Sequence, residues 1–126
     1  MKDNCKDRFL HVLCLIFLSV CFSACSLPRI VVLDDPLGPE EHLNLGVTYE
    51  KNGELDNALE EYKKAIENEP DSADAYNNLA WLYCTEKTNL DEAEALVLKA
   101  LQLNPSKQDI YNDTLERIRE LKRSKE

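Results

Sequence analysis

Few side chains in this sequence could do chemistry, and their spacing keeps them apart. Beyond residue 24 the chain holds one histidine, His42, and two cysteines, Cys25 and Cys84. A cysteine–histidine pair needs hydrogen-bond contact, but His42 and Cys84 fall on different predicted helices and at different levels. A metal site needs three or four converging ligands, which this set does not supply. We therefore expect no enzyme, no metal site and no cofactor.

Two other patterns that mark active sites are weak or missing in this sequence. The chain has only three glycines, which are too few for a glycine-rich loop that binds phosphate. Adjacent acids such as Glu60 and Glu61 are expected to lie on solvated faces of helices, without a role as a catalytic pair. The residue types therefore give no indication of catalysis.

The first 24 residues have the composition of a secretory signal. Lys2, Lys6 and Arg8 give a basic start, and an apolar run follows over residues 9–24. That run is shorter than the roughly 20 apolar residues that a membrane-spanning helix needs. Signal peptides combine a basic start with an apolar stretch of this kind. We predict that residues 1–24 are a signal peptide and take no part in the fold.

The signal ends in Phe22-Ser23-Ala24-Cys25, which resembles the lipobox of bacterial lipoproteins. The resemblance implies that Cys25 is lipidated and becomes the first residue of the mature chain. Its acyl chains would hold the protein on a bilayer, because each buried CH₂ contributes about 0.8 kcal/mol. Ser26 follows the cysteine, as in lipoproteins sorted to the outer membrane. The resemblance thus implies a periplasm-facing envelope protein, on the outer rather than the inner membrane. A signal anchor, or export without a lipid, stays open.

The charge of the chain is strongly acidic, which argues against nucleic acid as a partner. The leader holds three of the 15 bases and two of the 24 acids, which leaves 12 bases against 22 acids, a net charge of −10. Such a surface repels phosphate backbones. Bases gather only near the C-terminus, at Arg117, Arg119, Lys122, Arg123 and Lys125. They could complement the dipole at the end of a helix or contact a second acidic copy, so a homo-oligomer stays open.

Two segments between residues 39 and 106 repeat one pattern of side-chain sizes. Leu45 and Leu79 are 34 residues apart, and the last prolines of the two copies are 35 apart, which places the extra residue in a turn at 87–89. Small residues in such a pattern let two helices approach closely. The pattern consists of Leu45, Gly46, Tyr49, Ala58, Tyr62, Ala65 and Pro70 in the first copy, and of Leu79, Ala80, Tyr83, Ala93, Val97, Ala100 and Pro105 in the second.

A repeat of about 34 residues with this pattern resembles the tetratricopeptide repeat, a helix–turn–helix unit. The resemblance implies an all-α fold in which two repeats, residues 39–72 and 73–106, stack as a short right-handed solenoid. Residues 107–126 would form a helix that caps the open end of the second repeat. Residues 25–38 would link the lipidated cysteine to the repeats.

Helix boundaries follow from prolines, glycines and capping residues. Asp71 and Ser106 are expected to cap the helices that follow them through their side chains. The first two expected helices cover about residues 39–51 and 55–68. The third begins within residues 71–74 and ends near residue 86, and the fourth begins within residues 88–91 and ends near residue 104. The last expected helix covers about residues 107–123.

In tetratricopeptide arrays the first helix of each repeat lines a concave groove that binds a peptide or a protein. This likeness implies that the groove consists of Leu43, Val47, Glu50, Asn77, Asn78, Trp81 and Cys84, with Asp109 and Asp113 from the cap. Trp81 and the two aliphatic side chains would form an apolar patch suited to anchor a partner. Trp81 could instead pack against Val47 and the cap helix, and this alternative stays open.

Three functions fit these expectations. The first is a lipid-tethered scaffold that binds a protein during assembly of an envelope or secretion complex. The second is a structural subunit that self-associates, because a core of two repeats and a cap is small. The third is an accessory subunit of a separately encoded envelope peptidase, since residues 35–49 resemble repeat tails of bacterial cysteine peptidases.

Overall fold

A computed structural model describes residues 35–125 of the chain. The expected signal peptide, Cys25 and the linker up to residue 34 lie outside these residues. The described part is all-α, as the repeat pattern predicted. Its elements are the helices α2 (Pro39–Asn52), α3 (Leu55–Asn68), α4 (Ala73–Glu86), α5 (Leu90–Leu103) and α6 (Gln108–Arg123), with a short 3-10 turn, η1 (Pro105–Lys107), before α6.

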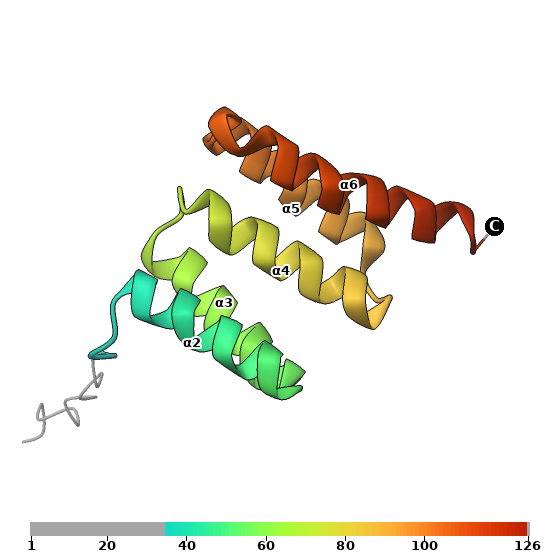
Figure 1. Ribbon diagram of the computed structural model, residues 1–126. Helices are drawn as coiled ribbons and strands as arrows, with labels where there is room; N and C mark the ends of the chain where they lie inside the picture. Colours follow the sequence, from blue (N-terminus) through green and yellow to red (C-terminus); the bar gives the residue numbers. More distant parts are fainter. Residues whose placement is uncertain (1–34, 126) are drawn as a thin grey trace, which may run out of the picture. The chain divides into compact units, whose positions relative to one another are not determined.

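The helices pack in chain order as two hairpins and a final helix (Figure 1). α2 pairs with α3 and α4 pairs with α5, while α3 contacts α4 and α5 contacts α6. The first helices of the hairpins, α2 and α4, lie side by side with α6 in one layer, and α3 and α5 form the layer behind (Figure 1). This arrangement confirms the expected stack of helix pairs.

The turns within the two hairpins differ by one residue, as the repeat spacing predicted. Two residues separate α2 from α3, and three residues, 87–89, separate α4 from α5. Gly53 closes α2 with φ +79, and Lys87 takes the same left-handed conformation after α4 with φ +55. Such residues let backbone N–H groups reach the last carbonyls of a helix. The second turn thus accommodates its extra residue without altering the helices.

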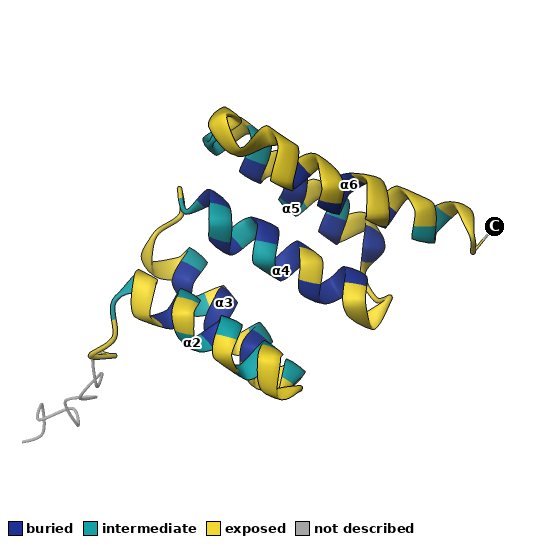
Figure 2. Cartoon of the chain, viewed as in Figure 1, coloured by how far each residue is buried: buried dark blue, intermediate teal, exposed yellow. Residues whose placement is uncertain are grey.

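The core lies between the two layers, and Figure 2 shows that every helix contributes buried residues. Ala58, Ala80 and Ala93 are fully buried at the expected points of close approach. A Cβ atom added to Gly46 would lie only 2.5 Å from Cε1 of Tyr62, whose side chain is fully buried. The first hairpin therefore closes only because residue 46 has no side chain.

The expected side-chain caps are wrong. Ser72, not Asp71, precedes α4, and its side chain makes no capping hydrogen bond. Ser106 instead donates from its backbone N–H and its hydroxyl to Oδ1 of Asn104, at 3.2 and 2.5 Å. Asn104 therefore organises the η1 turn, and α6 begins only at Gln108. Among the described residues, no helix is long and apolar enough to span a membrane.

Candidate functional site

The residues expected in the groove all belong to α2, α4 and α6, but they lie in different environments. Cys84 and Asn77 are buried, whereas Trp81 keeps 43% of its surface exposed. The expected cap residues, Asp109 and Asp113, are both exposed on α6. Those that are partly buried are Leu43, Val47, Glu50 and Asn78. Trp81 is therefore the most accessible member of the set on the two hairpins.

The groove residues of α2 face the core more than the solvent. Leu43 and Val47 pack against the buried cluster. Glu50 accepts a hydrogen bond of 2.7 Å from the hydroxyl of Tyr62, which belongs to the partner helix α3. Burial and this hydrogen bond raise the pKa of Tyr62 far above its ordinary value, so the phenol stays neutral. Leu43 and Val47 therefore contribute to the core, and Glu50 joins α2 to α3.

The groove residues of α4 divide into buried and accessible side chains. Asn77 is buried, and within residues 35–125 its Oδ1 atom has no hydrogen-bond partner. An unpaired buried acceptor of this kind costs roughly 1–3 kcal/mol. Burial raises the pKa of the Cys84 thiol, and the charge of Arg117 only partly opposes the shift. The thiol is therefore protonated and unsuited to act as a nucleophile.

A hollow of about 230 Å³ lies between the last turns of α4 and the second half of α6. We call it the Trp81 notch, and its lining consists of Trp81, Cys84, Thr85, Lys87, Arg117 and Leu121. Trp81 thus shares a hollow with the cap helix but is not covered by it. The side chain of Trp81 is therefore partly buried, and it lies beside α6 without being covered by it.

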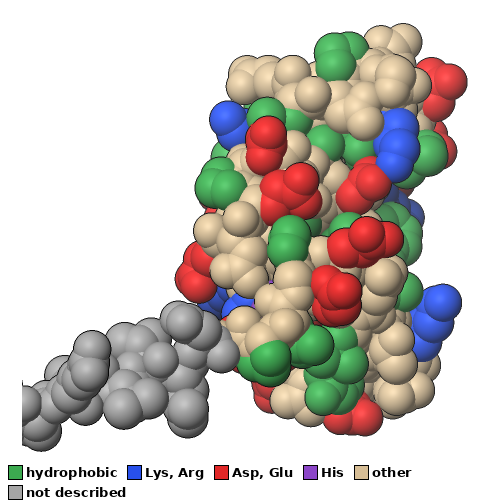
Figure 3. Space-filling model, turned by 90° about the vertical axis from the view of Figure 1, so that its left-hand side faces the viewer, with side chains coloured by type: hydrophobic (Ala, Val, Ile, Leu, Met, Phe, Trp, Pro, Cys, Tyr) green, Lys and Arg blue, Asp and Glu red, His purple; other side chains and the backbone are tan. Residues whose placement is uncertain are grey.

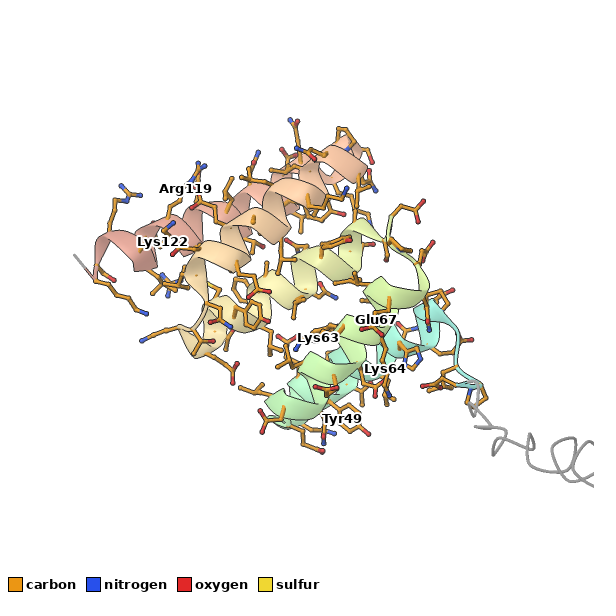
Figure 4. The ribbon with its side chains drawn as sticks, turned by 180° about the vertical axis from the view of Figure 1, so that it is seen from behind. Tyr49, Lys63, Lys64, Glu67, Arg119 and Lys122 are labelled. Carbon is orange, nitrogen blue, oxygen red and sulfur yellow. The ribbon has the colours of Figure 1, made fainter. Side chains whose placement is uncertain are left out.

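The structure also contains a buried polar cluster that the sequence did not predict. His42 is fully buried, and its Nδ1 atom lies 2.6 Å from Oε2 of Glu61. Its Nε2 atom lies 3.5 Å from Oδ2 of Asp35, and Lys64 (labelled in Figure 4) approaches both carboxylates at 3.2 and 3.6 Å. His42 thus packs within its own helix pair, α2 and α3. However, Glu61 is only 8% exposed, so its expected place on a solvated face is wrong.

One signal in the sequence could have revealed this cluster. The tetratricopeptide pattern commonly has tryptophan where this chain has His42. A buried polar side chain needs a hydrogen-bond partner, so the substitution implied a charged or polar residue on the facing helix. The spacing of 19 residues between His42 and Glu61 follows from the hairpin geometry and from no local rule.

Two of the four basic residues of α6 pair with acids of α5. Arg119 and Lys122 (labelled in Figure 4) donate to the two carboxylate oxygens of Glu94, at 2.8 and 2.9 Å. Lys122 also lies 2.6 Å from Asp91, and its hydrogen bonds to the two acids raise its pKa to about 12. These contacts join the cap helix to the second hairpin. The sequence had suggested a role at the helix dipole or a contact with a second copy, and neither expectation included this pairing.

Glu61 is expected to make stability depend on pH. Burial alone would raise its pKa, but hydrogen bonds from His42 and Lys64 outweigh burial and hold the pKa below 4.5. The carboxylate therefore stabilises the fold above its unfolded-state pKa, and this contribution is lost as the pH falls through the folded-state value. Glu61→Gln should lower the free energy of unfolding by about 2 kcal/mol at pH 7, and by clearly less near pH 4.

Urea unfolding of the purified protein at the two pH values measures this effect. Glu60→Gln changes the exposed neighbour on the same helix and should leave the stability within about 0.5 kcal/mol. Equal losses from both substitutions, or a loss from Glu61→Gln that stays constant down to pH 4, would contradict the role of the buried cluster.

Comparison with protein families gives a match. A family model described as "Tetratricopeptide repeat" matches residues 32–107, which is more than half of the chain and includes both helix hairpins. No curated protein matches the sequence.

Proposed function

The chain belongs to the tetratricopeptide repeat family, and on this premise we propose that it is a lipid-anchored scaffold that binds a protein in the cell envelope. Tetratricopeptide repeats generally mediate protein–protein interaction. The scaffold would hold its partner on the surface of α2, α4 and α6 during assembly of an envelope or secretion complex. No catalytic step is assigned to this chain.

The observation that carries the proposal is the exposure of Trp81 at the Trp81 notch. Tryptophan is enriched among the residues that dominate binding energy at protein interfaces. An indole that is 43% exposed offers a large apolar face and an N–H donor that a partner can cover. The surrounding helices hold it in place, which reduces the entropy lost on binding.

Trp81→Ala should therefore weaken binding strongly and stability weakly. Loss of a hot-spot side chain costs about 2 kcal/mol or more, which is roughly a thirtyfold loss of affinity. Because almost half of the side chain is exposed, the free energy of unfolding should fall by only about 1 kcal/mol. A crosslinking pull-down from native membranes, with the captured protein quantified, measures the binding loss.

The matched control is Leu98→Ala, because Leu98 is 41% exposed on α5, in the other layer. This variant should capture the partner as the unchanged protein does. If Trp81→Ala captures as much partner as Leu98→Ala does, the surface of α2, α4 and α6 is not the binding site.

The anchor is the second part of the proposal and depends on Cys25. Cys25→Ser should move the protein from the membrane fraction to the soluble fraction and remove the acyl mass from the mature N-terminus. Acyl chains dominate membrane affinity at about 0.8 kcal/mol for each buried CH₂, so the loss should be nearly complete. Fractionation and mass spectrometry measure both effects.

Cys21→Ser is the control for this experiment, because Cys21 lies in the same apolar run but is directly preceded by Val20 and not by a small residue. It should leave the protein lipidated and on the membrane. A Cys25→Ser protein that remains in the membrane fraction would show that the leader acts as a plain anchor.

A further inference from the structure

The Trp81 notch has the size and lining of a pocket for one side chain. Its volume of about 230 Å³ is smaller than the roughly 300–1,000 Å³ of small-molecule sites. Trp81, the neutral thiol of Cys84 and the half-buried Leu121 give it an apolar lining. It therefore suits an aliphatic or aromatic side chain better than a cofactor or a charged group.

Two basic residues stand at this notch with capacity to bind an anion. Within residues 35–125 the exposed Lys87 ammonium has no ion-pair or hydrogen-bond partner. Among the described residues Arg117 has one ion pair, a contact of 3.4 Å with Glu120 in which the two side chains are 58% and 60% exposed. An ion pair this exposed is worth little and exchanges readily for another carboxylate.

A second hollow is also lined by basic side chains, but these already have partners within the chain. It measures about 590 Å³ and is lined in part by Asp91, Lys122 and Lys125. Lys122 is held there by Asp91 at 2.6 Å, and Lys125 donates to the backbone carbonyl of Lys87 at 2.8 Å. The polar lining and the satisfied bases of this hollow leave little for an acidic ligand to gain.

The charge along the layer of α2, α4 and α6 changes from one end to the other. Where these helices begin, on the left in Figure 1, their first turns carry Glu40, Glu41, Asp74 and Asp109, and Asp and Glu side chains gather on that side (Figure 3). Lys87 follows the other end of α4, beside the Trp81 notch. Asp74 is paired with Lys107, but Glu40, Glu41 and Asp109 keep the beginnings of the helices acidic, so an acidic ligand is favoured at the notch, where Lys87 and Arg117 can accept a carboxylate.

We propose that the Trp81 notch seats one apolar side chain from an acidic stretch of a partner polypeptide, whose carboxylates pair with Lys87 and Arg117. This proposal rests on the proposed function, because it names the chemistry of the partner that the scaffold binds. It assigns the contact to the last turns of α4 and to α6, and it excludes a basic partner at this end of the surface.

Synthetic peptides test the proposal, with Trp81 as the probe, because it is the only tryptophan of the chain. Three decapeptides are titrated into the full chain of residues 1–126 in detergent. The first has two central leucines flanked by glutamates, the second replaces the glutamates with lysines, and the third replaces the leucines with serines. Only the first should shift the Trp81 emission to shorter wavelength in a saturable way, with at least tenfold tighter binding than the other two.

Charge reversal then locates the carboxylates. Lys87→Glu combined with Arg117→Glu should weaken the glutamate–leucine peptide about tenfold or more, because two attractions become repulsions. Lys51→Glu combined with Lys99→Glu makes the same change in net charge at two exposed sites outside the notch lining and should leave binding within about twofold. The milder Lys87→Gln should weaken binding two- to fivefold and is a second measurement should the double reversal unfold the protein.

Several outcomes would overturn the proposal. These are a lysine peptide that binds as tightly as the glutamate peptide, equal losses from the two double reversals, and no saturable change with any peptide. Emission that shifts with protein concentration alone would place a second copy in the notch and would also overturn it. If the double reversal still captures a partner from native membranes while Trp81→Ala does not, the scaffold function holds and only the acidic partner is wrong.

Discussion

Removal of residues 107–126 is expected to lower the melting temperature by about 20 °C or more. The deletion takes away Tyr111, Leu115 and Ile118, which are at most 6% exposed. Burial of three such side chains contributes roughly 5–9 kcal/mol, which is comparable to the whole stability of a small domain. It also uncovers the faces of α4 and α5 that α6 packs against. The truncated protein should therefore be largely unfolded in its second hairpin.

Polar contacts add to this loss. The hydroxyl of Tyr111 donates to Oδ1 of Asp74 at 2.7 Å, and Lys107 reaches the other oxygen of that carboxylate at 2.6 Å. Without α6 the side chain of Glu94 also loses both of its basic partners. Hydrogen exchange should then show weak protection in α4 and α5 and stronger residual protection in α2 and α3.

A shorter deletion is the control for this experiment. Removal of residues 124–126 leaves all of α6 in place and should change the melting temperature by no more than about 3 °C. A protein without residues 107–126 that melts at the same temperature as the full chain would contradict the capping role of α6.

Gly46→Val is expected to destabilise the first hairpin by about 3 kcal/mol, which corresponds to a fall in melting temperature of roughly 10–20 °C. A Cβ atom at residue 46 would lie 2.5 and 2.6 Å from Cε1 and Cδ1 of Tyr62. The ring cannot move aside freely, because it is fully buried and its hydroxyl is bound to Glu50. α2 and α3 would have to separate, which opens voids in the core around them. Valine forms helices slightly better than glycine, but this gain is only a few tenths of a kcal/mol.

Two further variants test whether the loss of stability comes from the clash between residue 46 and the ring of Tyr62. Asn44→Val puts the same side chain on an exposed position of α2 and should cost less than about 0.5 kcal/mol. Tyr62→Leu removes the ring, so Gly46→Val should cost less in that background than in the unchanged protein. Urea midpoints give all of these values, and equal costs of Gly46→Val in both backgrounds would show that the ring is not the obstacle.

Much of the helical framework follows from the sequence alone. The period of 34 residues, the small residues at 46, 58, 80 and 93, and the place of the extra residue all agree with the structure. The described helices begin and end within about two residues of the expected bounds. These features depend on neighbours within a few turns of helix, where periodicity, proline and glycine act directly. The identification of Leu43, Val47, Trp81 and Cys84 as groove residues stays a prediction from the repeat pattern.

The tertiary structure decided what each polar side chain does. It paired His42 with Glu61, turned Glu50 toward Tyr62, and placed Arg119 and Lys122 on Glu94. These contacts join residues 12 to 28 positions apart, so no local rule selects them. The sequence determined which faces of the helices are apolar, because that depends on periodicity within each helix. Only the packing of one helix on the next decided which charges are satisfied within the chain and left Lys87 and Arg117 beside an exposed tryptophan.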